Sequence, residues 1–213
     1  MKGLKVLWCV LITLPMITNL WDEEWMAKNW DVLSSISVSI VFQNLVVIVA
    51  VIAVFVGLTK VAPFLKWSWF SLFSKKDPET GESVPYKGTN INLIPSNVKY
   101  FGLAFLVLLA VNLPRYAHLE EELFREGMIS WEQGILMSLL FGLTHCLVGV
   151  PIGGGLAISV AGLWFTYQYF VGGVELSTVH HTTYNLILVS VLFLFLTLKH
   201  IVELTEKKTQ EIA

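Results

Sequence analysis

Three long stretches without a charged residue constrain this chain more than any other feature of its sequence. No Asp, Glu, Lys or Arg occurs at positions 32–59, 133–174 or 176–198. A helix needs roughly 20 apolar residues to cross the hydrocarbon core of a bilayer, and each of these stretches is long enough. Over the whole chain 55% of the residues are hydrophobic and 14% are charged, proportions that are unusual for a water-soluble globule. The sequence therefore predicts an integral membrane protein.

We expect the membrane-embedded part of the chain to be helical, because a helix satisfies its own backbone hydrogen bonds in lipid. A short, highly charged segment at 116–127 has the composition of a helix that is embedded in the membrane or lies at its surface. The predicted fold is an all-α, polytopic membrane helix bundle with this short charged helix. Its transmembrane helices, about six in number, are expected at approximately 6–20, 36–58, 97–113, 131–148, 156–170 and 176–200.

Changes in composition divide the chain into four parts. Two helices form an N-terminal accessory segment, a polar cytoplasmic loop rich in Lys, Pro, Gly, Ser and Asn follows, and a membrane core with the motifs described below precedes a polar C-terminal tail. The expected bounds are 1–65, 66–97, 98–202 and 203–213. Ser130 and Gln133 have the spacing of a capping box that begins the helix at 131. The pair Gly172 and Gly173 separates the last two helices.

The distribution of lysine predicts the orientation of the chain. With six helices, the N-terminus, the polar loop and the C-terminal tail share one side of the membrane and carry most of the lysines. The other side has only Lys28, Arg115 and Arg125, among many acidic residues. Loops rich in Lys and Arg remain in the cytoplasm. We therefore expect cytoplasmic termini in a multi-pass protein of a prokaryotic plasma membrane.

Charge and cysteine content exclude some classes of function. The formal net charge is −2 and no dense cluster of Lys and Arg is present, so we expect no nucleic-acid partner. Cys9 and Cys146 lie in apolar segments, where we expect each to pack as a small hydrophobic residue rather than to form a disulfide. The glycine run at 153–155 lacks the lysine of a phosphate-binding loop, so it is expected to be a flexible connection or a site of close packing.

Ionisable side chains inside a membrane are energetically costly, so each one is a candidate functional residue. They lie in three segments that are separate in the sequence, and together with one amide they are Glu120, Glu121, Arg125, His145, His181 and Asn185. A glutamate and a histidine can deprotonate a water molecule. A second histidine with an amide can donate hydrogen bonds to an oxyanion. This combination of side chains favours hydrolysis.

The same residues fall into three short motifs. The sequence has EExxxR at 120–125, FxxxH at Phe141 and His145, and HxxxN at His181 and Asn185. In this order the motifs resemble those of the CAAX protease and bacteriocin-processing family, also called CPBP or Abi, of glutamic intramembrane endopeptidases. The resemblance covers about 116–198, and three motifs in order are more specific than any one of them.

The resemblance implies cleavage of a peptide bond within or beside the membrane, with no cofactor and no metal ion. Glu120 and His145 would activate the attacking water, and the second glutamate and the arginine of the EExxxR motif would support the site. His181 and Asn185 would form the oxyanion hole. The expected partners are the lipid bilayer and a membrane-associated protein or peptide substrate. A prenylated C-terminus, a bacteriocin leader or a C-terminal membrane anchor would each fit the family.

Two residues depart from the family's usual pattern. Glu126 stands where a glycine is common, and Glu122 adds a third glutamate to the pair. Neither removes a group to which the resemblance gives a role. His180 directly precedes the motif histidine but has no asparagine four residues later, so we expect it at the membrane interface, together with His118 and His200.

Three other functions remain open from the sequence. A metal-dependent membrane protease could use the same Glu and His residues as ligands, although the sequence has no His-Glu-x-x-His run. A haem-binding electron carrier would use His145 and His181 as axial ligands but would leave the glutamates and the arginine unexplained. A non-catalytic membrane scaffold or immunity factor could have the same fold.

Overall fold

The computed structural model describes residues 2–66, 74–76, 83–85, 101–148 and 150–212. This part of the chain is helical except for one antiparallel hairpin in the polar loop, most of which lies outside the described residues. The all-α expectation is therefore confirmed. In chain order the elements are α1 (Lys2–Thr18), η1 (Asn19–Trp21), α2 (Glu23–Ser34), α3 (Val38–Val61), η2 (Pro63–Lys66), β1 (Ser74–Lys76), β2 (Ser83–Pro85), α5 (Ala104–Arg125), α6 (Trp131–Thr144), η4 (His145–Val148) and α7 (Ile152–Ile212).

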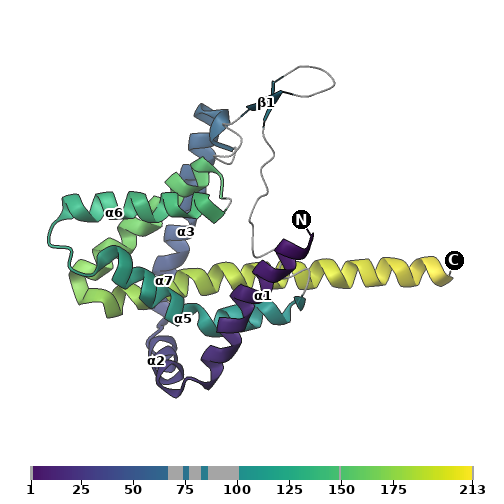
Figure 1. Ribbon diagram of the computed structural model, residues 1–213, viewed down its shortest axis with the longest axis horizontal. Coiled ribbons are helices and arrows are strands. Elements are labelled where there is room, and N and C mark those ends of the chain that lie inside the picture. The colour runs from purple at the N-terminus through teal and green to yellow at the C-terminus, as the bar shows by residue number, and fades with distance from the viewer. Residues whose placement is uncertain (1, 67–73, 77–82, 86–100, 149, 213) are drawn as a thin grey trace.

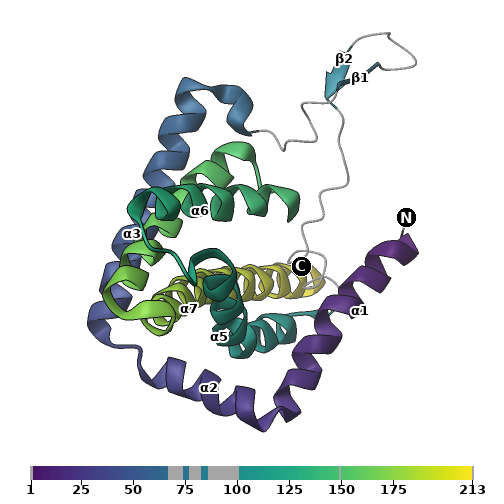
Figure 2. The ribbon, with the colours of Figure 1, turned by 60° about the vertical axis from the view of Figure 1, so that its left-hand side comes forward.

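The long helix α7 holds the fold together. It packs against α3, α5 and α6, and α5 also contacts α6 less extensively. At Gly172 and Gly173 the backbone leaves the helical conformation, and Gly173 has a φ of 71°, which a side chain would disfavour. The chain changes direction there, so that 152–171 and 174–212 form two halves with different neighbours (Figure 1). In Figure 2, α1, α2 and α3 form an outer frame around α5, α6 and α7.

Several sequence predictions are confirmed. Helices cover the segments predicted at 6–20 and 36–58, and the predicted glycine break separates the halves of α7. Ser130 caps α6 by accepting a hydrogen bond from the Gln133 amide at 3.4 Å. The Gln133 side chain accepts from the Ile129 amide at 2.9 Å, one residue earlier than a standard capping box. Both cysteines are buried and free, as expected.

The expectation of a separate short charged helix is wrong. The apolar segment and the charged segment form one helix, α5, which continues through Pro114. Proline removes a backbone hydrogen bond, but neighbouring side chains can supply donors to the carbonyls near the break. The amide of Asn112 donates to the Leu108 carbonyl at 2.9 Å, and that of Asn29 donates to the Val111 carbonyl at 3.2 Å. The helix therefore continues beyond Pro114 and carries its glutamates into the bundle.

The surface and the interior have the polarity expected of a protein surrounded by lipid. Large apolar side chains cover the outside of α3, whereas fully buried residues include Arg125, Glu121 and Asn44. In the described part of the chain, two helices are long and apolar enough to cross a membrane, α3 and the part of α7 at Ile152–Val202. A shorter apolar helix covers Cys9–Trp21. Two such helices agree with membrane association, whereas the predicted six spans are not confirmed.

Glycines allow α6 and the first half of α7 to cross at very close range. A Cβ atom on Gly142 would collide with the Gly155 carbonyl and the Ser159 hydroxyl, and would lie 2.6 Å from the Ser159 amide nitrogen. A Cβ atom on Gly155 would lie 2.5 Å from the sulfur of Cys146. Of the two roles expected for the glycine run at 153–155, close packing is therefore the one observed.

We predict that Gly142→Ala lowers the thermal unfolding midpoint of the detergent-solubilised protein, with a loss of about 1–3 kcal/mol in the free energy of unfolding. The reason is that backbone atoms, which cannot rotate away, occupy the space of the new methyl group. Gly57→Ala in α3 is the matched control, because a Cβ atom there would have no neighbour within 4 Å. An unchanged midpoint for Gly142→Ala would contradict the close helix crossing.

Candidate active site

The candidate site lies where the charged end of α5 meets the second half of α7. Glu121 and Arg125 are one turn apart on α5, and Ser177 and His181 are one turn apart on α7. The two residues of each pair therefore lie on the same face of their helix, and the two faces are turned towards each other. The exposed fractions of Glu121, Arg125 and His181 are 0%, 1% and 2%. Two predicted motifs, EExxxR and HxxxN, thus meet through side chains that are shielded from the surroundings.

The carboxylate of Glu121 is the centre of this cluster. Its Oε1 accepts a hydrogen bond from Arg125 Nη1 at 2.9 Å and lies 2.7 Å from His181 Nδ1. Its Oε2 accepts a hydrogen bond from the Ser177 hydroxyl, whose oxygen is also 2.9 Å from the Phe165 carbonyl. Because an ionised carboxylate can only accept hydrogen bonds, the proton in the contact with His181 belongs to Nδ1. Glu121 thereby sets the orientation of the imidazole ring.

Arg125 links the cluster to α6 and to the first half of α7. Its Nη2 donates to the Gly162 carbonyl at 3.2 Å. The guanidinium carbon lies 4.9 Å from the ring centre of Phe141 and 5.5 Å from that of Phe165. A guanidinium keeps its charge even when it is buried, and aromatic faces stabilise that charge. Arg125 therefore neutralises Glu121 and connects three helical segments.

The other face of His181 meets the remaining motif glutamate. His181 Nε2 is 3.6 Å from Glu120 Oε2, and the side chain of Glu120 is 42% exposed. The imidazole also stacks on the Phe165 ring, with 4.6 Å between ring centres and an angle of 18°. His181 is thus fixed from behind by Glu121 and Phe165. Its second nitrogen points towards a carboxylate that is accessible from outside the bundle.

The FxxxH motif reaches the cluster through its phenylalanine. The Phe141 ring is 5.4 Å from the His181 ring and 5.0 Å from the His145 ring, centre to centre. His145 Nδ1 is 2.8 Å from the Phe141 carbonyl, which caps the end of α6. A backbone carbonyl can only accept, so Nδ1 carries the proton and Nε2 is left for other contacts. His145 is therefore near the cluster but not hydrogen bonded to it.

Asn185 is the predicted site residue that the structure does not join to the others. It is half-buried in α7, one turn beyond His181, and its amide makes no hydrogen bond to any residue in the described ranges. The structure therefore brings the histidine of the HxxxN motif into the cluster but not its asparagine.

The expectation that His180 lies at the membrane interface is wrong. Its exposed fraction is 2%, and its Nδ1 accepts hydrogen bonds from Asn44 Nδ2 at 3.2 Å and from Trp164 Nε1 at 3.3 Å. His180 connects α3 to both halves of α7 and helps to fix the rotation of the helix that carries His181. Asn44 lies in a very apolar helix next to a second amide, Gln43, and this polar pair was the available sequence signal for a buried partner.

Sequence reasoning also missed Ser177. Its hydroxyl contacts Glu121, and the side chain is completely buried. Ser177 is four positions before His181, the same spacing that relates His181 to Asn185. Serine is common in membrane helices, so this spacing was a weak signal until a partner on α5 could be identified.

The described residues contain no group of three or more His, Cys, Asp and Glu side chains that could hold a metal ion.

Comparisons with known proteins returned no matching family model, no matching curated protein and no matching solved structure.

We predict that Arg125→Met destabilises the protein by about 3–5 kcal/mol, because Glu121 would remain buried without its ion partner. Adding Glu121→Gln should restore part of this loss, since the amide carries no charge. A double-mutant cycle with denaturant unfolding in detergent measures the coupling. Glu24→Gln, which breaks an exposed ion pair with Lys28, is the control and should change the stability by less than about 1 kcal/mol. Strict additivity of the two substitutions would contradict the buried pair.

Proposed function

We propose that this chain is an intramembrane endopeptidase that cleaves a membrane-associated protein or peptide with a water molecule activated by glutamate and histidine. The single observation that carries the proposal is the arrangement around His181, which lies between the buried Glu121 and the partly exposed Glu120. One carboxylate orients the imidazole, and the other can be reached by a substrate. The resemblance of the motifs to those of the CPBP family supports the same reaction.

In the proposed reaction, the oxygen of a water molecule attacks the carbonyl carbon of the peptide bond. Glu120 accepts a proton from this water, and the Nε2 atom of His145 helps to hold the water in place. When His181 carries a proton on Nε2, that N–H donates to the oxyanion that forms on the carbonyl oxygen. The carbon–nitrogen bond then breaks, and the leaving amine takes the proton from Glu120. Glu121, Arg125 and Ser177 position His181.

Several features of the site fit this reaction. A buried ion pair and an aromatic ring that stacks on the imidazole keep His181 in one orientation before a substrate binds. The apolar surroundings strengthen hydrogen bonds to a developing negative charge. The exposed face of Glu120 gives water and a peptide access to the carboxylate.

A second candidate function is a non-catalytic membrane scaffold or immunity factor. The observation that favours it is the complete burial of Glu121 and Arg125, which would also suit an ion pair that only holds α5 against α7. The two functions differ in their dependence on Glu120, since this side chain contributes little to packing.

We predict that Glu120→Gln abolishes processing of the substrate in membranes, with a loss of at least about 100-fold in rate, because glutamine cannot accept the proton from water. His145→Ala should also lose activity. The substrate is identified as a cellular protein whose processing stops in both variants at equal expression. Glu126→Gln is the matched control, because this exposed carboxylate lies just beyond the end of α5, and it should process the substrate at the wild-type rate.

Unchanged processing in Glu120→Gln, with a phenotype that depends only on the presence of the protein, would contradict the protease and support the scaffold. Loss of processing on treatment with a chelator, followed by recovery with zinc, would instead favour a metal-dependent protease.

We further propose that the chain crosses the plasma membrane about six times with both termini in the cytoplasm, as the lysine distribution indicates. The turn between α5 and α6 then faces the outside of the cell. We predict that Glu126→Cys is modified by a membrane-impermeant maleimide in intact cells, whereas a tag at the C-terminus is digested by protease only after lysis. The native cysteines are buried, which keeps the background labelling low. Labelling of position 126 only in lysed cells would reverse this orientation.

A further inference from the structure

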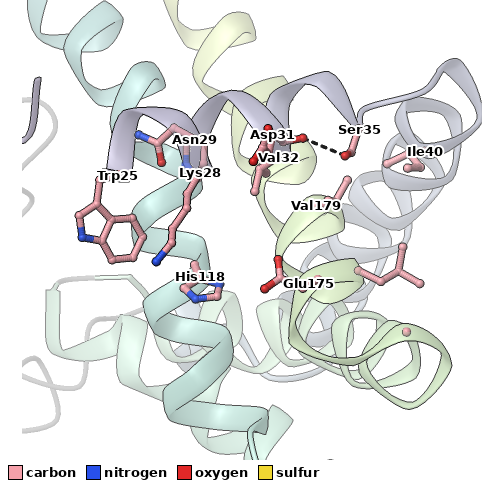
Figure 3. A pocket seen from close by; sticks show the side chains of 13 residues that line it. Trp25, Lys28, Asn29, Asp31, Val32, Ser35, Ile40, His118, Glu175 and Val179 are labelled. Carbon is pink, nitrogen blue, oxygen red and sulfur yellow. Dashed lines mark hydrogen bonds between the residues drawn. The ribbon is translucent and has the colours of Figure 1, made fainter. Parts of the chain in front are cut away.

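A pocket of about 540 Å³ lies beside the candidate site, between α2, α5 and the start of the second half of α7 (Figure 3). This volume is within the range of about 300–1,000 Å³ that is typical of ligand sites. Figure 3 shows Trp25 and Lys28 extending from α2 towards His118 on α5, while Glu175 faces them from α7. The pocket is therefore lined by charged and polar side chains as well as apolar ones, unlike the apolar outer surface of α3.

Three side chains in the pocket wall have acceptor oxygens without a partner among the described residues. The carboxylates of Asp31 and Glu175 make no hydrogen bond or ion pair to any described residue, and both line the pocket. Asn29 also lines it and has an exposed fraction of 3%. Its Nδ2 donates to the Val111 carbonyl, but its Oδ1 has no partner among the described residues. Because a buried acceptor is stabilised by a donor, these oxygens favour a ligand that donates hydrogen bonds.

Lys28, the lysine of the pocket wall, lies close to several carboxylates. Lys28 Nζ is 2.9 Å from Glu24 Oε1 and 5.1 Å from the ring centre of Trp25. Its pKa is raised above the ordinary value, first by the hydrogen bond and charge of Glu24 and then by the charges of Glu122 and Glu175. The negative potential of these carboxylates therefore extends to the position of the ammonium group.

Side-chain contacts connect one wall of the pocket to the candidate site. His118, which lines the pocket, has its Nδ1 3.4 Å from the Thr178 hydroxyl and its Nε2 3.3 Å from Glu122. Thr178 directly follows Ser177, whose hydroxyl binds Glu121. His118 is thus linked to the Glu121 cluster through two adjacent residues of α7.

We propose that this pocket binds the ammonium or guanidinium group of a lysine or arginine in the peptide substrate. The identity of the ligand as a substrate side chain rests on the proposed function, whereas the preference for a cation rests on the pocket alone. A bound cation supplies donors to the carboxylates of Asp31 and Glu175, which line the pocket. Such a subsite selects substrates with a basic residue close to the cleaved bond.

Binding of a fluorescent pentapeptide tests the proposal without requiring cleavage. The full-length Glu120→Gln protein in detergent is titrated with a peptide that contains arginine and with the same peptide containing citrulline, and anisotropy gives the Kd. We expect the arginine peptide to bind at least about tenfold more tightly, because citrulline has a similar shape without the charge. Equal affinity for the two peptides would overturn the cation site.

Two pocket variants must shift the affinity in opposite directions. Glu175→Gln should weaken binding of the arginine peptide, whereas Lys28→Gln should strengthen it by removing a like charge. Both side chains are exposed, so these variants are expected to fold, and the thermal midpoint checks this. Glu132→Gln, an exposed carboxylate outside the pocket, is the control and should leave the Kd unchanged. Weaker binding in Lys28→Gln would show an anion site and overturn the proposal.

The outcomes also separate the pocket from the protease. If the arginine peptide is preferred but no variant of Glu120 affects processing in cells, the proposed function fails and the cation site remains. If processing depends on Glu120 but the two peptides bind equally, only the pocket proposal fails. Agmatine, a free guanidinium compound, should bind far more weakly than the arginine peptide, and equal affinity would overturn the assignment to a substrate side chain.

Discussion

The ion pair between Glu121 and Arg125 is the interaction on which the arrangement of the helices depends. Both side chains are buried inside the bundle, where either charge alone would be strongly unfavourable. Their pairing is completed by Ser177 and His181 from one half of α7 and by the Gly162 carbonyl from the other. The pair is therefore stable only when α5 and both halves of α7 are assembled. Two charges within a few ångströms determine how three helical segments meet.

This constraint explains why the surrounding contacts are close and specific. Glycines on α6 and α7 allow backbone atoms to approach, and the Phe141 and Phe165 rings fill the space around the guanidinium. A second polar network, between Asn44, Trp164 and His180, connects α3 to both halves of α7. Since two separate networks hold this part of α7, the imidazole of His181 keeps a defined position relative to Glu120.

Much of this could be predicted from the sequence, because helical spacing and membrane polarity are local properties. The pairing of Glu121 with Arg125 follows from their separation of four residues, and the break in α7 follows from two adjacent glycines. The burial of His180 could not be predicted, since its partners lie on α3 and in the first half of α7. Nor could the continuation of α5 through Pro114, because a proline removes a backbone hydrogen bond and usually ends or kinks a helix.

The order of these elements along the chain has a consequence for biosynthesis. Among the described residues, every hydrogen-bond partner of the Glu121 and Arg125 side chains outside α5 lies later in the sequence, at Gly162, Ser177 and His181. When α5 leaves the ribosome, its charged end has no buried environment to enter. In a membrane protein this end would stay at the lipid–water boundary until the last helix has been made. Insertion of α5 to its final depth would then be a late event, coupled to the completion of the chain.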